Sequence, residues 1–218
     1  MRALEWQRRL REQGELYGKR LFRVAELANL AGEGRASVAV QLVRLQRLGV
    51  IDRCAPGLYG LPGLATLDDL LLQIDVEAYI TGFYALHHHG LVTQVPAVIT
   101  CFTNRRRTHH ELRTTLGRLR LSFVKSPIYH RPDEGIVAPP EQALCDFVYM
   151  RRRQGQDATD GVTFRHMDRM SRVQLASILD RYPRTVAAAA MRWAPCSGFS
   201  LGITLGNEVA VSQREHHP

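Results

Sequence analysis

The order of segments in residues 22–49 restricts the fold of this chain most strongly. Segment 22–31 (FRVAELANLA) places apolar residues at helical spacing. The turn Gly32-Glu33-Gly34 separates it from a longer segment, 35–49, in which Val38, Leu42, Leu45 and Leu48 form one apolar stripe. Two helices joined by a short glycine-containing turn are typical of a helix-turn-helix.

A hairpin is predicted directly after the second of these helices. Val50 and Ile51 begin a β-prone run, Ala55-Pro56-Gly57 is a turn sequence, and Leu58-Tyr59 begins the return strand. Such a hairpin is the wing of a winged helix-turn-helix. A preceding helix is predicted over residues 3–14, ending at Gly14, with Leu4, Gln7 and Leu10 on one helical face.

The polar positions of segment 35–49 predict a DNA-reading surface. In a helix-turn-helix the second helix enters the major groove, where Gln pairs with adenine edges and Arg with guanine edges or phosphates. A basic residue beside the hairpin turn can reach the neighbouring backbone. The candidate DNA-binding residues are Arg35, Ser37, Gln41, Arg44, Arg47 and Arg53. Each arginine is equally compatible with a solvated surface or a phosphate contact, so the order of the elements carries the prediction.

The charge distribution favours the same interpretation. The chain has a net charge of +8, and residues 1–60 hold 11 basic and 6 acidic residues. A basic block beside a nearly neutral middle region is typical of a nucleic-acid-binding domain joined to another domain. We therefore predict two domains, a winged helix at 1–62 and a second domain at 63–218.

Residues 63–193 predict a mixed α/β domain with a helical C-terminal part. Helices are expected after Thr66, which forms a capping box with Asp69, and over 78–91, 140–153, 171–182 and 185–193. Strands are expected at 97–102, 119–124 and 135–138, with a polar loop at 103–113. A terminal hairpin within 194–218 is a further expectation. The predicted fold class is α+β.

No pattern in the sequence supports catalysis or metal binding. His87-His88-His89 are consecutive, so on a helix they point in different directions and cannot bind one ion. Asp133 and Glu134 lie in a Pro-Asp-x-Gly context that turn formation explains at least as well as acid–base chemistry. Nucleophile-elbow, Walker and dinucleotide-binding motifs do not occur. We predict a protein that is not an enzyme, with no metal and no cofactor.

Three arginines, Arg105, Arg106 and Arg107, form the main basic run of the second domain. A solvated surface and a contact with nucleic acid or an acidic protein are equally compatible with this run. The four cysteines are far apart and no apolar run is long enough to cross a bilayer. The expected location is therefore the cytoplasm, without a membrane partner.

The order of several motifs resembles the AbiEi-type antitoxins of type IV toxin–antitoxin systems. The resemblance rests on GLYGLP (57–62), YITGFYALHHHGLVTQVP (79–96), a strand–basic loop–strand unit, and VAPPEQALCDFVYM (137–150). The last of these contains the Pro-Glu-x-Ala-Leu-x-Asp helix start as Pro140, Glu141, Ala143, Leu144 and Asp146. The resemblance to the family extends from about residue 21 to residue 182.

This resemblance implies a function that the residues alone do not. It implies an antitoxin that counteracts a nucleotidyltransferase-like toxin, without requiring a stable complex, and that represses its own operon by binding inverted repeats in promoter DNA. The alternative is a winged-helix transcriptional regulator whose second domain binds a small effector. An enzyme acting on nucleic acid through Asp133, Glu134 and the histidines is the third and weakest hypothesis.

Overall fold

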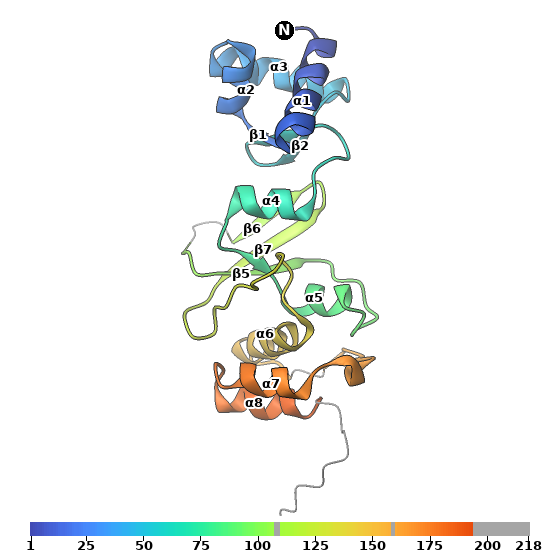
Figure 1. The fold of residues 1–218 in the computed structure, drawn as a ribbon, viewed down its shortest axis with the longest axis vertical. Coiled ribbons are helices and arrows are strands. Elements are labelled where there is room, and N and C mark those ends of the chain that lie inside the picture. Colours follow the sequence, from blue (N-terminus) through green and yellow to red (C-terminus); the bar gives the residue numbers. More distant parts are fainter. Residues whose placement is uncertain (107–109, 158–159, 194–218) are drawn as a thin grey trace, which may run out of the picture.

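The computed structural model describes residues 1–106, 110–157 and 160–193 and has a mixed α+β fold. Figure 1 shows an elongated molecule whose elements are stacked along its long axis. Residues 1–62, called the head below, lie at one end, and the later helices lie at the other. The hairpin predicted within 194–218 falls outside the described residues.

The head combines helices with a small antiparallel sheet. The sheet has three strands in the order β1-β3-β2, and Leu21 is paired with Gly60 across β1 and β3. In chain order the elements are α1 (Ala3–Tyr17), β1 (Leu21–Arg23), α2 (Val24–Ala31), α3 (Arg35–Arg47), β2 (Asp52–Ala55) and β3 (Leu58–Gly60). The two predicted helices and the hairpin are thus present, while β1 was predicted as part of a helix.

Helix α1 is longer than predicted, and Leu4 and Leu10 differ in burial. It continues through Gly14 and ends at Gly18, which adopts the left-handed conformation (φ 63°) at the helix C-terminus. Its buried residues are Trp6 and Leu10, whereas Leu4 is 80% exposed. Leu4, which helical spacing groups with Leu10, therefore does not share its burial, and Trp6 accompanies Leu10 in the head core instead.

Helix α3 buries the predicted stripe except at its end. Val38, Leu42 and Leu45 are buried, but Leu48 is 58% exposed because the helix ends at Arg47. The head core contains residues from all three helices and the following strand region, namely Trp6, Leu10, Phe22, Leu27, Ala28, Val38, Leu42, Leu45, Ile51 and Leu61. The position of α3 is therefore fixed by apolar packing along one side.

The remaining residues, called the body, are built on a second sheet with strand order β4-β5-β7-β6. Strands β5 and β7 are parallel, and β4 and β6 are antiparallel edge strands. The bounds are α4 (Leu67–Ile74), β4 (Tyr79–Ile80), α5 (Gly82–His88), β5 (Ile99–Thr103), β6 (Glu111–Thr114), β7 (Gly117–Phe123), α6 (Pro140–Arg153), the 3₁₀-helix η1 (Met167–Arg169), α7 (Arg172–Leu179) and α8 (Arg184–Met191).

Three body segments differ from the sequence-based expectation. The helix predicted over 78–91 begins only at Gly82, since residues 79–80 extend the sheet by pairing with Phe102 and Cys101. The predicted polar loop 103–113 includes the start of β6, and the predicted strand 135–138 makes only an isolated bridge between Val137 and Ile80. Sheet pairing overrides local helix propensity at the first segment.

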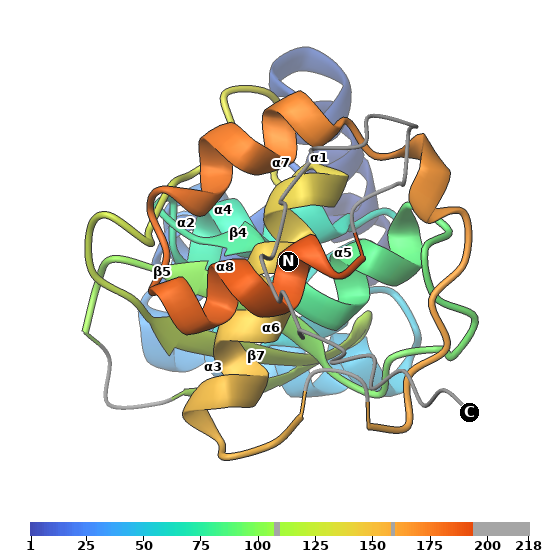
Figure 2. The ribbon, with the colours of Figure 1, turned by 90° about the horizontal axis from the view of Figure 1, so that it is seen from below.

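Both faces of the body sheet are covered. Ile99, Cys101 and Leu121 pack on the side of α4, while Tyr79 and Phe102 pack among α5 and α6 on the other side. Figure 2 shows α7 and α8 lying against α6, which closes the end of the molecule. No helix in the described ranges combines the length and apolar character needed to traverse a bilayer.

Helix α4 joins the head to the body. Its N-terminus carries the predicted capping box, in which the Thr66 hydroxyl accepts from the Asp69 backbone N–H at 3.2 Å. Leu70 packs with the head residues Leu21 and Leu58, whereas Leu71 packs with the body sheet. Because one helix contributes to both cores, the head sheet is buried against the body rather than joined to it by a free linker.

Candidate nucleic-acid interface

The side of α3 that faces away from the head core contains most of the candidate DNA-binding residues. Arg35, Ser37, Arg44 and Arg47 are exposed, and Gln41 is half-buried at the edge of this side. The helix contains no acidic residue. Its exposed surface is therefore uniformly basic or neutral.

Several cations beside α3 are paired with carboxylates, whereas the described residues give no such pair to the arginines of α3. On α1, Arg9 lies 3.0 Å from Glu5, and near β1 Lys19 lies 2.6 Å from Glu26. Within the described ranges, no carboxylate lies within 4.0 Å of the guanidinium groups of Arg35, Arg44 or Arg47. Unneutralised arginines on one helix produce the positive potential that attracts phosphates.

Gln41 and Ser37 lie in a hydrogen-bond network that the sequence did not predict. The Trp6 indole N–H donates to Gln41 Oε1 at 3.0 Å, and the Gln41 amide nitrogen donates to Glu33. The Ser37 hydroxyl donates to the same carboxylate at 2.7 Å. The Ser37 hydrogen bond and the amine of Met1 lower the pKa of Glu33, so its carboxylate is ionised at neutral pH.

This network changes the role that the structure supports for two predicted residues. Gln41 Oε1 also accepts from the Met1 amine at 3.5 Å, and Gln41 Nε2 also donates to the Ser37 hydroxyl at 3.4 Å, so both lone pairs and both amide hydrogens are engaged within the head and none is left for an adenine edge. The hydrogen bonds that Gln41 makes with Trp6 and Glu33 were not predicted from the sequence. Two features of the sequence could have indicated these bonds. A buried Trp needs an acceptor for its N–H. Glu33 precedes Ser37 by four residues, the spacing at which side chains meet on a helix.

The hairpin places Arg53 on the exposed side of β2, opposite Tyr59 on β3. Its turn contains Gly57 at φ 75°, a conformation that favours glycine. Position 60 on β3 also requires glycine, because the Cβ of any other residue would lie 2.6 Å from the backbone oxygen of Arg20. The hairpin is thus held closely against β1, and Arg53 projects from a fixed strand.

The predicted basic run of the body is partly engaged with its own surroundings. Arg105 lies 3.9 Å from Asp75 and 3.7 Å from Glu77, and the Arg106 guanidinium lies over the Phe123 ring. Arg107 lies outside the described residues. A role of this run in binding nucleic acid or protein stays a prediction.

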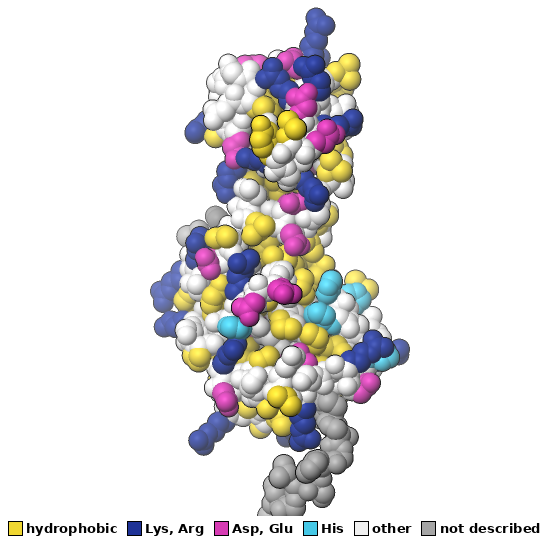
Figure 3. Space-filling model, viewed as in Figure 1, with side chains coloured by type: hydrophobic (Ala, Val, Ile, Leu, Met, Phe, Trp, Pro, Cys, Tyr) yellow, Lys and Arg dark blue, Asp and Glu magenta, His cyan; other side chains and the backbone are white. Residues whose placement is uncertain are grey.

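The described histidines of the body are not grouped as metal ligands. His89 Nε2 lies 2.8 Å from the backbone oxygen of Ala138, so its ring is oriented by the protein interior. Figure 3 shows histidine side chains gathered on one flank of the body. Within the described ranges, no group of three or more His, Cys, Asp or Glu side chains could hold an ion. Asp133 and Glu134 are exposed.

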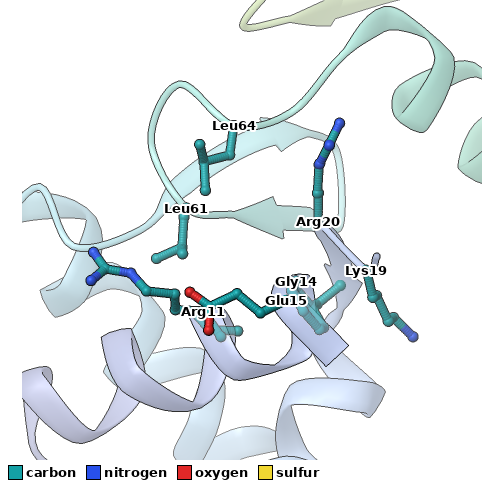
Figure 4. A pocket seen from close by; sticks show the side chains of 9 residues that line it. Arg11, Gly14, Glu15, Lys19, Arg20, Leu61 and Leu64 are labelled. Atoms are coloured by element: carbon teal, nitrogen blue, oxygen red, sulfur yellow. The ribbon is translucent and has the colours of Figure 1, made fainter. Parts of the chain in front are cut away.

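A small cavity of about 300 Å³ lies in the head between α1 and the segment after β3. Leu10, Phe22, Leu61 and Leu64 form its apolar lining. Arg11, Glu15, Lys19 and Arg20 lie at its edge, and Figure 4 shows the charged ends of Arg11, Lys19 and Arg20 directed outwards. The volume is at the lower limit of small-molecule sites.

Asp146 on α6 is a fully buried carboxylate of the body, in which Asp75 and Glu141 are also buried. Asp146 accepts hydrogen bonds from Thr81 Oγ1 and Tyr182 Oη, both at 2.6 Å, and from Tyr79 Oη at 3.2 Å. Burial raises the pKa of Asp146 to about 7, although these donors oppose the shift. The two motif segments 79–96 and 137–150 are therefore joined through this side chain in the core of the body.

No family model matches the chain, and no curated protein matches it significantly. The function is consequently argued from the arrangement of residues and from the order of motifs in the sequence.

Proposed function

We propose that the head is a winged helix that binds duplex DNA, with α3 in the major groove and the β2–β3 hairpin as the wing. The order α1-β1-α2-α3-β2-β3 and the sheet order β1-β3-β2 support this class of protein. The observation that carries the proposal is the set of arginines on α3 without carboxylate partners in the described residues. Arg35, Arg44 and Arg47 contact phosphates in this arrangement, and Arg53 contacts the backbone beside the wing.

Within that class, we propose that the protein is the antitoxin of a type IV toxin–antitoxin system and represses its own operon. The support is the order of motifs that resembles AbiEi-type antitoxins. Two of these motifs meet at Asp146, which accepts hydrogen bonds from Tyr79 and Thr81, so they form one structural unit. The proposed opponent is a nucleotidyltransferase-like toxin encoded next to it, and neutralisation does not require a stable complex.

The two halves of this proposal are tested with the full-length chain. The chain is co-expressed with the adjacent gene, and survival is scored together with expression of a reporter from its own promoter. We expect rescue and repression from the natural sequence, and rescue without repression from the double variant Arg44→Ala/Arg47→Ala. Death of cells in spite of full-length expression refutes the antitoxin half, and an unaltered reporter refutes the repressor half.

A winged-helix regulator with a small effector is the second candidate. The cavity lined by Leu10, Phe22 and Leu61 is the observation that favours a small ligand, although it lies beside the head and not within the second domain as the sequence suggested. A ligand of this site would be mainly apolar, because Lys19 is paired with Glu26 and Arg20 with Asp69. A metabolic gene beside this one, and a ligand that raises the melting temperature, would favour this candidate over the antitoxin.

A further inference from the structure

The outward side of α3 has an apolar part. Val38, Leu42 and Leu45 face the head core, so the opposite side of the helix is formed by Ala36, Val40 and Val43, with Arg44 and Arg47 following toward its C-terminal end. Val40 is 74% exposed and Val43 is 50% exposed. A helix that only faced water would carry polar residues at these positions.

The polar residues that could read base edges are placed elsewhere. Gln41 is bound to Trp6 and Glu33, and Ser37 donates to Glu33. On the outward side of α3, the part before Arg44 and Arg47 is a strip of methyl groups. In the major groove, the base feature that such groups contact is the 5-methyl group of thymine.

The surroundings of this strip favour DNA over an apolar protein partner. Arg44 and Arg47 on α3 border it, and Arg35 lies at its N-terminal end. None of the three has a carboxylate within 4.0 Å among the described residues. A narrow apolar strip bordered by cations is complementary to methyl groups between two phosphate backbones.

We propose that α3 selects its operator through thymine methyl groups, with Val40 and Val43 as the contacting residues. This inference rests on the proposed DNA binding by the head and specifies what that surface reads. Arg35, Arg44 and Arg47 position the helix on phosphates and contribute little to sequence choice.

The test replaces thymine by deoxyuracil in bound duplexes. Duplexes covering the region upstream of the gene are screened with the full-length chain, and each thymine of a bound duplex is then replaced singly by deoxyuracil. Base pairing is kept and only the methyl group is lost. We expect about a fourfold loss of affinity at the contacted positions, which is the factor expected for one buried methyl group.

Two variants connect the effect to the residues. In Val40→Ala or Val43→Ala, one or more contacted positions should bind thymine and deoxyuracil equally well. Both side chains are exposed, so shortening them leaves the head folded. The matched control is Val173→Ala, because Val173 on α7 is a valine of similar exposure (80%) remote from α3 in the chain and in Figure 1. This control should keep the full difference between the two bases.

The outcomes separate the inference from the proposed function. Tight duplex binding that is indifferent to every deoxyuracil overturns methyl recognition and leaves the DNA-binding proposal intact. Failure to bind any duplex at low salt overturns both. A change of oligomeric state in Val40→Ala, with the thymine preference unchanged, shows that the strip is an interface between copies and also overturns the inference.

Discussion

The Trp6 indole N–H donates a hydrogen bond to Gln41 Oε1 at 3.0 Å and thereby ties α1 to α3. Trp6 is fully buried, so no water can replace this acceptor. The Gln41 amide nitrogen continues the connection to Glu33 at the turn between α2 and α3. Gln41 thus orients α3 within the head.

The first prediction concerns Gln41→Ala. The change leaves the buried Trp6 N–H without an acceptor, which costs about 1–3 kcal/mol of unfolding free energy. DNA affinity should fall by the same factor for all operator variants, because the whole helix is misplaced. Denaturant unfolding and competition binding with single base-pair changes measure the two effects.

Gln46→Ala is the matched control, because Gln46 is an exposed glutamine on the same helix. It should alter stability by less than about 0.5 kcal/mol. If Gln41→Ala relaxed the preference at a single base pair and left stability unchanged, Gln41 would be a base-reading residue, as its position in the sequence suggested.

The second prediction concerns the salt dependence of DNA binding. Each phosphate contact contributes about 0.9 to the slope of log affinity against log salt. Arg44→Ala and Arg47→Ala should each weaken binding to every sequence and each make the slope shallower by about that amount. Filter binding between low and moderate salt gives the slopes.

Arg8→Ala serves as the control for this series, since Arg8 on α1 already lies 3.7 Å from Glu12. Its slope should equal that of the natural chain. Equal slopes for all three variants would place the DNA elsewhere than on α3.

Strong local signals made part of the fold predictable. The Thr66–Asp69 capping box and the proline start of α6 at Pro140 were located correctly, because caps depend on a few neighbouring residues. β4 and β6 were not predicted. Their strand state depends on pairing with β5 and β7, which are distant in the chain or separated by a polar loop.

The candidate site was predictable at the level of the helix but not of each side chain. Helical periodicity placed Arg44 and Arg47 on the exposed side. It could not show that Gln41 bonds to Trp6, because that contact joins residues 35 positions apart and depends on how α1 packs on α3. Val40 and Val43 were not predicted as contact residues, because their side chains carry no polar group that could hydrogen-bond to a base edge.

The third prediction concerns Leu70, whose side chain is fully buried where α4 meets the head. Leu70→Ala should cost about 2–5 kcal/mol of unfolding free energy through the cavity it creates. The loss weakens the shared core of head and body, so calorimetry should show the single transition separating into two. Leu72→Ala is the control on the same helix, since Leu72 is 48% exposed. One sharp transition in Leu70→Ala would show that the head and body unfold together without this contact.

The last prediction follows from Asp146. Burial holds its pKa at about 7 in the folded chain, above the ordinary value of about 3.9. Between these values the folded chain keeps the proton while the unfolded chain releases it, so the contribution of Asp146 to stability is fully present below about pH 4 and is lost as pH rises through 7. The fall amounts to about 4 kcal/mol at most, at about 1.4 kcal/mol for each pH unit.

Asp146→Asn isolates this contribution, because the amide does not titrate and its one oxygen can replace Oδ2, which accepts from Thr81 and Tyr79. Burial raises the pKa of Tyr182, so its hydroxyl stays protonated and donates throughout this range. As pH rises from 4 to 8, the unfolding free energy of the natural chain should therefore fall relative to that of the variant. A difference that stays constant over this range would mean that Asp146 is ionised in the folded chain already at pH 4. The three hydroxyl donors would then outweigh the cost of burying its charge.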